Sequence, residues 1–137
     1  MMKSILSLAL YTATALAQGI YINSPAAGTE LQAGETVTVQ LVRPVFSENV
    51  AEIGIAIGIE SCSGSSGCPD PDSEIGNLLY SGPYDPQSNG PPDPYENFTI
   101  TVPDVTGPAQ IGVVRPFLVG LSYEFVVGTA VTNVTIV

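Results

Sequence analysis

The sequence contains no histidine and no tryptophan, and its single lysine, Lys3, lies near the beginning. Without histidine, the Ser-His and Cys-His pairs that catalyse acyl transfer cannot form. Without a lysine in the body of the chain, Schiff-base chemistry has no nucleophile. Two carboxylates suffice to hydrolyse a glycoside, but no pair among the thirteen acidic residues stands out. We therefore expect a protein that is not an enzyme and uses no cofactor.

Positive charge is scarce as well. Beyond Lys3 the only basic side chains are Arg43 and Arg115, which stand against thirteen aspartates and glutamates and leave the full chain with a net charge of −10. A surface of this sign repels phosphate backbones and anionic lipid headgroups. We therefore expect a soluble monomer that has neither nucleic acid nor membrane as a partner.

No later stretch approaches the ~18 consecutive apolar residues that a membrane helix needs. The N-terminus instead combines Lys3, an apolar segment over Ile5–Leu10, and the small-x-small site Ala15-Leu16-Ala17. This order is typical of a cleaved secretory signal peptide. The sequence therefore predicts a leader over residues 1–17, a single domain over residues 18–137, and secretion to the extracellular space.

Apolar and polar residues alternate along much of the chain. In Thr36–Leu41 and in Tyr95–Pro103, apolar side chains fall on one face and polar side chains on the other. Such patterns with turn signals between them are typical of antiparallel sandwiches. We expect an all-β, immunoglobulin-like antiparallel β-sandwich of seven or eight strands. Further strands are expected at Ile20–Asn23, Ile53–Glu60, Leu78–Ser81, Ala109–Val114, Tyr123–Val127 and Asn133–Ile136.

The expected strand Ile53–Glu60 has two unlike faces. Its four isoleucines form a face that belongs in the core, while Gly54, Ala56 and Gly58 form the other. A face of small residues leaves backbone accessible to a flat partner, and Gly112 on a neighbouring strand extends it. Either this face binds a partner, or a tyrosine covers it; the candidates are Tyr80, Tyr84 and Tyr95.

The segment from Cys62 to Pro94 holds seven of the twelve prolines and five of the fourteen glycines. Its composition predicts one long excursion from the sandwich with one short edge strand at most. The only two cysteines, Cys62 and Cys68, indicate in an exported chain a disulfide that pins this excursion. A redox or metal pair is disfavoured because the spacing is not C-x-x-C and histidine is absent. The acidic run Asp70–Glu74 favours a solvated turn over a calcium site, so we predict no metal.

Two sequons predict N-glycosylation. Asn97-Phe98-Thr99 and Asn133-Val134-Thr135 each place the asparagine on the polar face of an expected strand, where a glycan is tolerated.

Arg43 and Arg115 each precede a proline, which favours an extended backbone. Each arginine is expected either to pair with a carboxylate within the structure or to anchor an acidic partner. The three tyrosines named above also offer a stacking platform for a carbohydrate, although tryptophan is absent. The candidate binding surface thus comprises Gly54, Ala56, Gly58, Gly112, Tyr80, Tyr84, Tyr95, Arg43 and Arg115.

Several stretches, taken in order, carry a family resemblance: Arg43–Phe46, Val50–Gly58, Leu79–Gln87, Tyr95–Pro103 and Gly107–Val113. They resemble the fungal necrosis-inducing secreted proteins, a family of small exported proteins that also carry a cysteine pair. The resemblance implies a secreted effector that acts on plant immune signalling or cell death by binding a host protein, such as a receptor-associated kinase. It implies no catalytic residues. The alternative is a cell-wall-associated or carbohydrate-binding module.

Overall fold

The computed structural model describes residues 19–45, 48–64, 67–88 and 93–137. The predicted leader, residues 1–17, lies outside this part of the chain. Within it every regular element is a β-strand, and no helix suited to crossing a membrane occurs among these residues. The strands are β1 (Tyr21–Ser24), β2 (Thr29–Leu31), β3 (Thr36–Val42), β4 (Val50–Glu52), β5 (Ile55–Ser61), β6 (Asn77–Gly82), β7 (Tyr95–Thr101), β8 (Gly107–Val119) and β9 (Glu124–Ile136).

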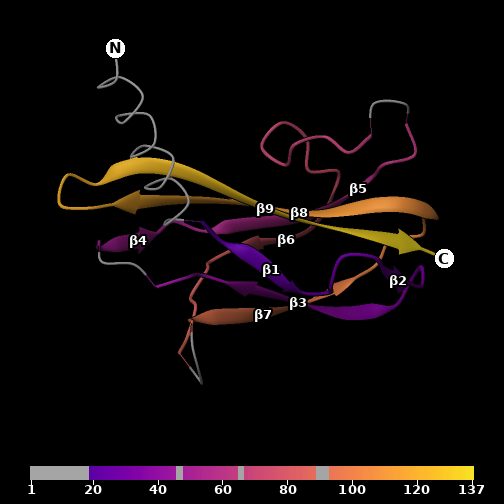
Figure 1. Ribbon diagram of the computed structural model, residues 1–137, viewed down its shortest axis with the longest axis horizontal. Coiled ribbons are helices and arrows are strands. Elements are labelled where there is room, and N and C mark those ends of the chain that lie inside the picture. Colours follow the sequence, from indigo (N-terminus) through magenta and orange to yellow (C-terminus); the bar gives the residue numbers. More distant parts are fainter. Residues whose placement is uncertain (1–18, 46–47, 65–66, 89–92) are drawn as a thin grey trace, which may run out of the picture.

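The strands form two sheets that pack face to face (Figure 1). The smaller sheet has the order β1-β3-β7, and the larger one has the order β2-β9-β8-β5-β6, with β4 also paired to β8. The pairs are antiparallel except that β2 runs parallel to β9. β1 and β2 follow each other but belong to different sheets, and β4 and β5 pair successively with β8. Counting each of these couples as one strand leaves seven, which confirms the predicted immunoglobulin-like sandwich.

The core lies between the sheets and uses the predicted alternation. Val39, Leu41 and Phe98 point inward from the smaller sheet, where each is at most 5% exposed. Burial of each such side chain contributes about 1.5–3 kcal/mol relative to leaving it in water. The larger sheet contributes Ile55, Ile57, Ile59, Ile111, Val113, Val134 and Ile136.

A bulge between β4 and β5 corrects the predicted strand Ile53–Glu60. Glu52 opposes Phe117 on β8, and Ala56 opposes Val114, so three intervening residues face two. The extra residue turns both Glu52 and the buried Ile55 toward the interior. The expectation that Ile53 shares the core face is therefore wrong, because its side chain is 53% exposed.

Proline at position 116 explains where this bulge sits. Pro116 lies inside β8, which continues past the predicted end at Val114 to Val119. Proline has no N–H to give to a neighbouring strand, so within sheets it occurs at edges and bulges. Its carbonyl still accepts a hydrogen bond from the Ile53 N–H at 3.3 Å. The missing donor thus coincides with the place where pairing is already interrupted.

The excursion that follows β5 folds back over the outside of the larger sheet (Figure 1). The Gln110 side chain on β8 donates a hydrogen bond to the Pro69 carbonyl at 2.7 Å. The predicted short edge strand is β6, at one end of the larger sheet. The described residues of the excursion therefore cover one part of the outer side of that sheet.

Candidate functional site

The outer face of the larger sheet is apolar where β8 and β9 run together beyond the excursion. Phe125 and Val127 both lie on β9, where they are 62% and 45% exposed, while the inward side chains of this strand are largely buried. Cross-strand pairs place Leu118 beside Phe125, Pro116 beside Val127, and Ala56 beside Val114. We call this surface the open face; it comprises Ile53, Ala56, Val114, Pro116, Leu118, Phe125 and Val127.

The open face contains a shallow hollow of about 580 Å³ next to the bulge. It is lined by Gly54 and Ala56, two of the small residues predicted to form a binding surface, and by Gly82 and Pro83. A Cβ on Gly54 would stand 3.0 Å from the Gly82 carbonyl oxygen, so glycine lets the chain pass close to β6 here. The prediction of accessible small residues thus agrees with the structure at these two positions.

The turn between β8 and β9 extends the apolar surface at its end. Leu121 is 90% exposed and Tyr123 is 66% exposed. Tyr123 has a φ of 54°, in the left-handed region that residues with a Cβ seldom adopt. The Gly120 N–H donates to the Asn49 carbonyl at 2.9 Å, which attaches this turn to the segment before β4.

Gly58 and Gly112 correct the predicted binding surface, because both lie beneath the excursion. They oppose each other on β5 and β8, and both are buried. A Cβ on Gly112 would lie 3.1 Å from the Pro71 ring, and one on Gly58 would lie 2.7 Å from Cγ1 of Ile75. The cover is therefore a proline and an isoleucine of the excursion, and none of the three tyrosines provides it.

Both predicted arginines bind one carboxylate, Glu52. The Arg115 Nε donates to Glu52 Oε1 at 2.8 Å, and its second nitrogen reaches Oε2 in a two-point arrangement. Arg43 donates to the same Oε2 at 3.0 Å. The Arg115 side chain is fully buried, and its guanidinium lies 3.7 Å from the Phe117 ring centroid. Of the two expectations for the arginines, the structure contains the internal ion pair.

The three tyrosines do not share one exposed face. Tyr84 is only 4% exposed, and its hydroxyl donates to the Leu41 carbonyl at 3.3 Å. Burial raises the pKa of the Tyr84 hydroxyl far above its usual range, against the opposing effect of Arg115. The half-buried Tyr80 packs on Phe98 with ring centroids 4.7 Å apart, and Tyr95 on β7 pairs with Val42 on β3. The stacking platform that we expected from these residues is therefore not formed.

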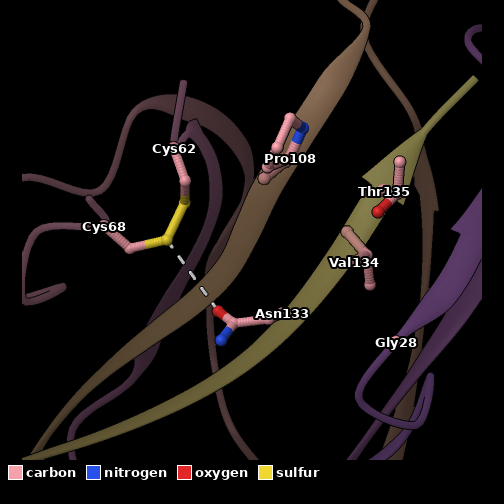
Figure 2. A pocket seen from close by; sticks show the side chains of 8 residues that line it. Gly28, Cys62, Cys68, Pro108, Asn133, Val134 and Thr135 are labelled. Carbon is pink, nitrogen blue, oxygen red and sulfur yellow. Dashed lines mark hydrogen bonds between the residues drawn. A yellow bond between two sulfur atoms is a disulfide. The ribbon is translucent and has the colours of Figure 1, made fainter. Parts of the chain in front are cut away.

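The predicted disulfide joins Cys62 and Cys68 and lies beside the exposed Asn133 (Figure 2). The Cys68 sulfur is 3.9 Å from Asn133 Oδ1, a van der Waals contact because a disulfide sulfur carries no hydrogen. Figure 2 shows the amide nitrogen, the atom that would carry a glycan, turned away from the sulfurs. These residues line a hollow of about 240 Å³ together with Gly28 and Pro108.

The second sequon asparagine, Asn97, is exposed on the smaller sheet, where its Oδ1 accepts a hydrogen bond from Gln40 at 3.1 Å. Over the described ranges, no group of three or more histidine, cysteine, aspartate or glutamate side chains is arranged to hold a metal ion. Asp72 and Glu74 are exposed in the excursion.

Fold and site together define a small immunoglobulin-like sandwich module with one uncovered apolar face. The chain belongs to the Nis1 family, a family of fungal effector-like proteins whose model matches residues 13–135. No curated protein matches the chain. Among solved structures it is similar to the fibronectin(III)-like modules of Clostridium thermocellum CbhA, at 16% identity and a TM-score of 0.40. That alignment covers 86% of this chain and 45% of the other.

The exposed apolar side of β9 was not predicted from the sequence. The sequence predicted separate strands at Ala109–Val114, Tyr123–Val127 and Asn133–Ile136, whereas β8 extends to Val119 and β9 is one strand of thirteen residues that spans the last two. The signal was present in Phe125 and Val127, two apolar residues at the spacing that one strand face requires. Their exposure depends on which face the other sheet covers, which a single strand does not reveal.

Proposed function

We propose that the protein is a secreted effector that acts by binding a host protein through the open face. The observation that carries the proposal is an exposed apolar surface on a protein of strongly acidic composition. Contiguous apolar patches on soluble domains are commonly interaction sites. The Nis1 family membership supports an effector-like role, and the leader predicted over residues 1–17 supports secretion.

The proposed partner is a protein of plant immune signalling or cell death, such as a receptor-associated kinase. This choice follows from the family resemblance. The acidic composition favours a partner whose contact surface is basic around an apolar centre, because such a surface complements both features.

A binding experiment with matched variants tests the proposal. The mature protein, residues 18–137, is titrated with purified kinase domains of plant receptor kinases, next to Val127→Asp and Thr38→Asp. Val127 lies on the open face, whereas Thr38 is exposed on the smaller sheet. A buried valine contributes about 1.5 kcal/mol or more, so Val127→Asp should weaken binding by at least about tenfold and Thr38→Asp should not. Equal binding by all three proteins, or none by wild type, would reject the proposal.

The predicted export and glycosylation belong to the same proposal. Protein secreted from a fungal host should lose mass on digestion with an N-glycosidase. Asn97→Gln and Asn133→Gln should each remove one step of that loss. A secreted product whose mass is unchanged by the enzyme would remove both glycan assignments.

The carbohydrate-binding alternative loses its main support in the structure, because Tyr84 is buried and Tyr80 packs against Phe98. Cosedimentation with chitin, glucan and cellulose provides the comparison. We expect the protein to remain in the supernatant with all three polymers.

A further inference from the structure

In the described part of the chain, one edge of the larger sheet has no paired strand along most of its length, although β1 of the other sheet lies close to β9. β9 pairs with β8 from Glu124 to Ile136 on one side. On its other side β2 reaches only Val134–Ile136. Among the described residues no strand pairs with this side of β9 over residues 124–133, where the edge of the open face lies.

The register shows which backbone groups point out of this edge. On the β2 side, the Gly28 N–H donates a hydrogen bond to the Asn133 carbonyl at 2.8 Å. Alternate residues of a strand direct their backbone groups the same way, and the register between β8 and β9 has no irregularity. The N–H and C=O groups that point outward at the open edge are therefore those of Phe125, Val127, Thr129 and Val131.

The usual protections of a strand edge are missing here. Natural edges carry charged residues, prolines or bulges that prevent another strand from pairing. Residues 125–136 contain no charged residue and no proline, and no bulge interrupts their pairing with β8. The same four residues direct their side chains to the outer side, where Phe125, Val127 and Val131 are each at least 45% exposed. A strand added at this edge would both satisfy the backbone and extend the apolar surface.

We propose that a partner adds an extended, positively charged segment to β9 as a further strand, alongside residues 125–131. This inference rests on the proposed function, namely that the protein acts by binding, and it specifies how. Backbone hydrogen bonds supply affinity in this mode, and alternate side chains supply specificity.

Charge selects the occupant. Glu124 stands at one end of the open edge, and the exposed Glu30 of β2 stands at the other. Both arginines of the described chain bind Glu52. A second copy of this acidic chain would be repelled, whereas lysine or arginine at the ends of the incoming segment would be attracted. The occupant is therefore a basic strand of another protein, and self-association is the competing outcome.

Hydrogen exchange with a defined peptide tests the proposal without the kinase. The probe is an acetylated, amidated peptide with lysine at both ends and valine alternating with threonine between them. In the free mature protein, the amides of Phe125, Val127 and Thr129 should exchange fast, while those of Val126 and Gly128, bonded to β8, exchange slowly. The peptide should slow exchange of the first set. Peptide binding that leaves these amides fast, or no binding, would overturn the proposal.

Controls separate strand addition from attraction by charge alone. A probe methylated on its edge-facing backbone nitrogens should bind at least about tenfold more weakly, since several hydrogen bonds are lost. A probe with glutamate at both ends should also bind more weakly, and added salt should weaken the lysine probe. Equal affinity of the methylated probe would overturn the proposal.

A protein variant tests the same edge. Thr129→Pro removes an outward N–H, a place where proline is tolerated, and should abolish peptide binding. If Thr129→Pro does not fold, Val127→Lys places a charge on the edge and should weaken peptide binding as well.

Wild-type protein that doubles its mass in sedimentation, with protection of these amides that rises with its own concentration, would identify a second copy as the occupant and overturn the proposal. Peptide docking without kinase binding would leave strand addition standing and reject the proposed host partner.

Discussion

The outer face of β5, β8 and β9 has two halves, one covered by the excursion and one exposed. In one half Gly58 and Gly112 oppose each other, and the excursion lays Pro71 and Ile75 directly on them. In the other half Pro116 and Val127 oppose each other, and Val127 is 45% exposed. Glycines lie beneath Pro71 and Ile75 in the covered half, whereas exposed apolar side chains such as Val127 occupy the other half. The two glycines therefore serve internal packing, and the exposed apolar residues are the ones that we propose to contact a partner.

The largest expected effect comes from breaking the interior beneath the open half. Glu52→Gln should lower the free energy of unfolding by about 3–5 kcal/mol, because it leaves the buried guanidinium of Arg115 without its carboxylate. Urea unfolding measures this. Glu48→Gln, at an exposed position nearby, is the control and should change stability by less than about 0.5 kcal/mol. Similar small losses for both variants would mean that the ion cluster does not hold this half together.

Removing the disulfide next to the covered half should have the second-largest effect on stability. Cys62→Ser with Cys68→Ser should cost about 2–3 kcal/mol, since the disulfide limits the unfolded chain over this short loop. Hydrogen exchange should show the loss first at Gly112, which the excursion covers, and later in β3 of the other sheet. Uniform acceleration across both sheets would show that the cover is not a separate unit.

Enlarging one small residue in each half distinguishes the two halves directly. Gly58→Ala should destabilise the protein by about 1–3 kcal/mol, because the new Cβ meets the Ile75 carbonyl and side chain. Ala56→Val, two residues earlier on the open half, should change stability by no more than about 0.5 kcal/mol. Comparable losses at both positions would contradict the difference in cover.

Alkaline pH should sharpen the comparison through Tyr84, which lies 6.0 Å from the Arg115 guanidinium beneath the open half. Its folded-state pKa is raised above the ordinary 10.0, so its contribution to stability is complete below that value and is lost as pH rises above it. Tyr84→Phe should lose about 1 kcal/mol near neutral pH with the hydrogen bond to Leu41. The variant should then show a weaker fall in stability toward about pH 11 than wild type, as urea titrations at both pH values would reveal. An identical alkaline fall would exclude Tyr84 as its source.

The sandwich was predictable because two-residue alternation is a local signal. Val39 and Leu41 lie on the predicted inward face of β3, and Phe98 and Ile100 lie on that of β7. The disulfide was also predictable, from the count of cysteines and the expected compartment.

The site was predictable only in part, because it depends on contacts between distant segments. Gly54 and Ala56 lie on the predicted surface, yet Gly58 of the same row is covered by Ile75, seventeen positions later. The bulge that exposes Ile53 arises opposite Pro116, which no pattern within one strand indicates. Tyr84 was expected on the surface, but its ring enters the core, where its hydroxyl finds the Leu41 carbonyl.

Chemical-shift mapping tests the central claim most directly. Isotope-labelled mature protein is titrated with a plant receptor-kinase domain that binds it, and backbone shifts are followed residue by residue. We predict that the largest changes fall on Ala56, Val114, Leu118, Phe125 and Val127. Changes concentrated on the covered half around Gly58 and Gly112, or on the polar outer face of β3 and β7, would contradict the account.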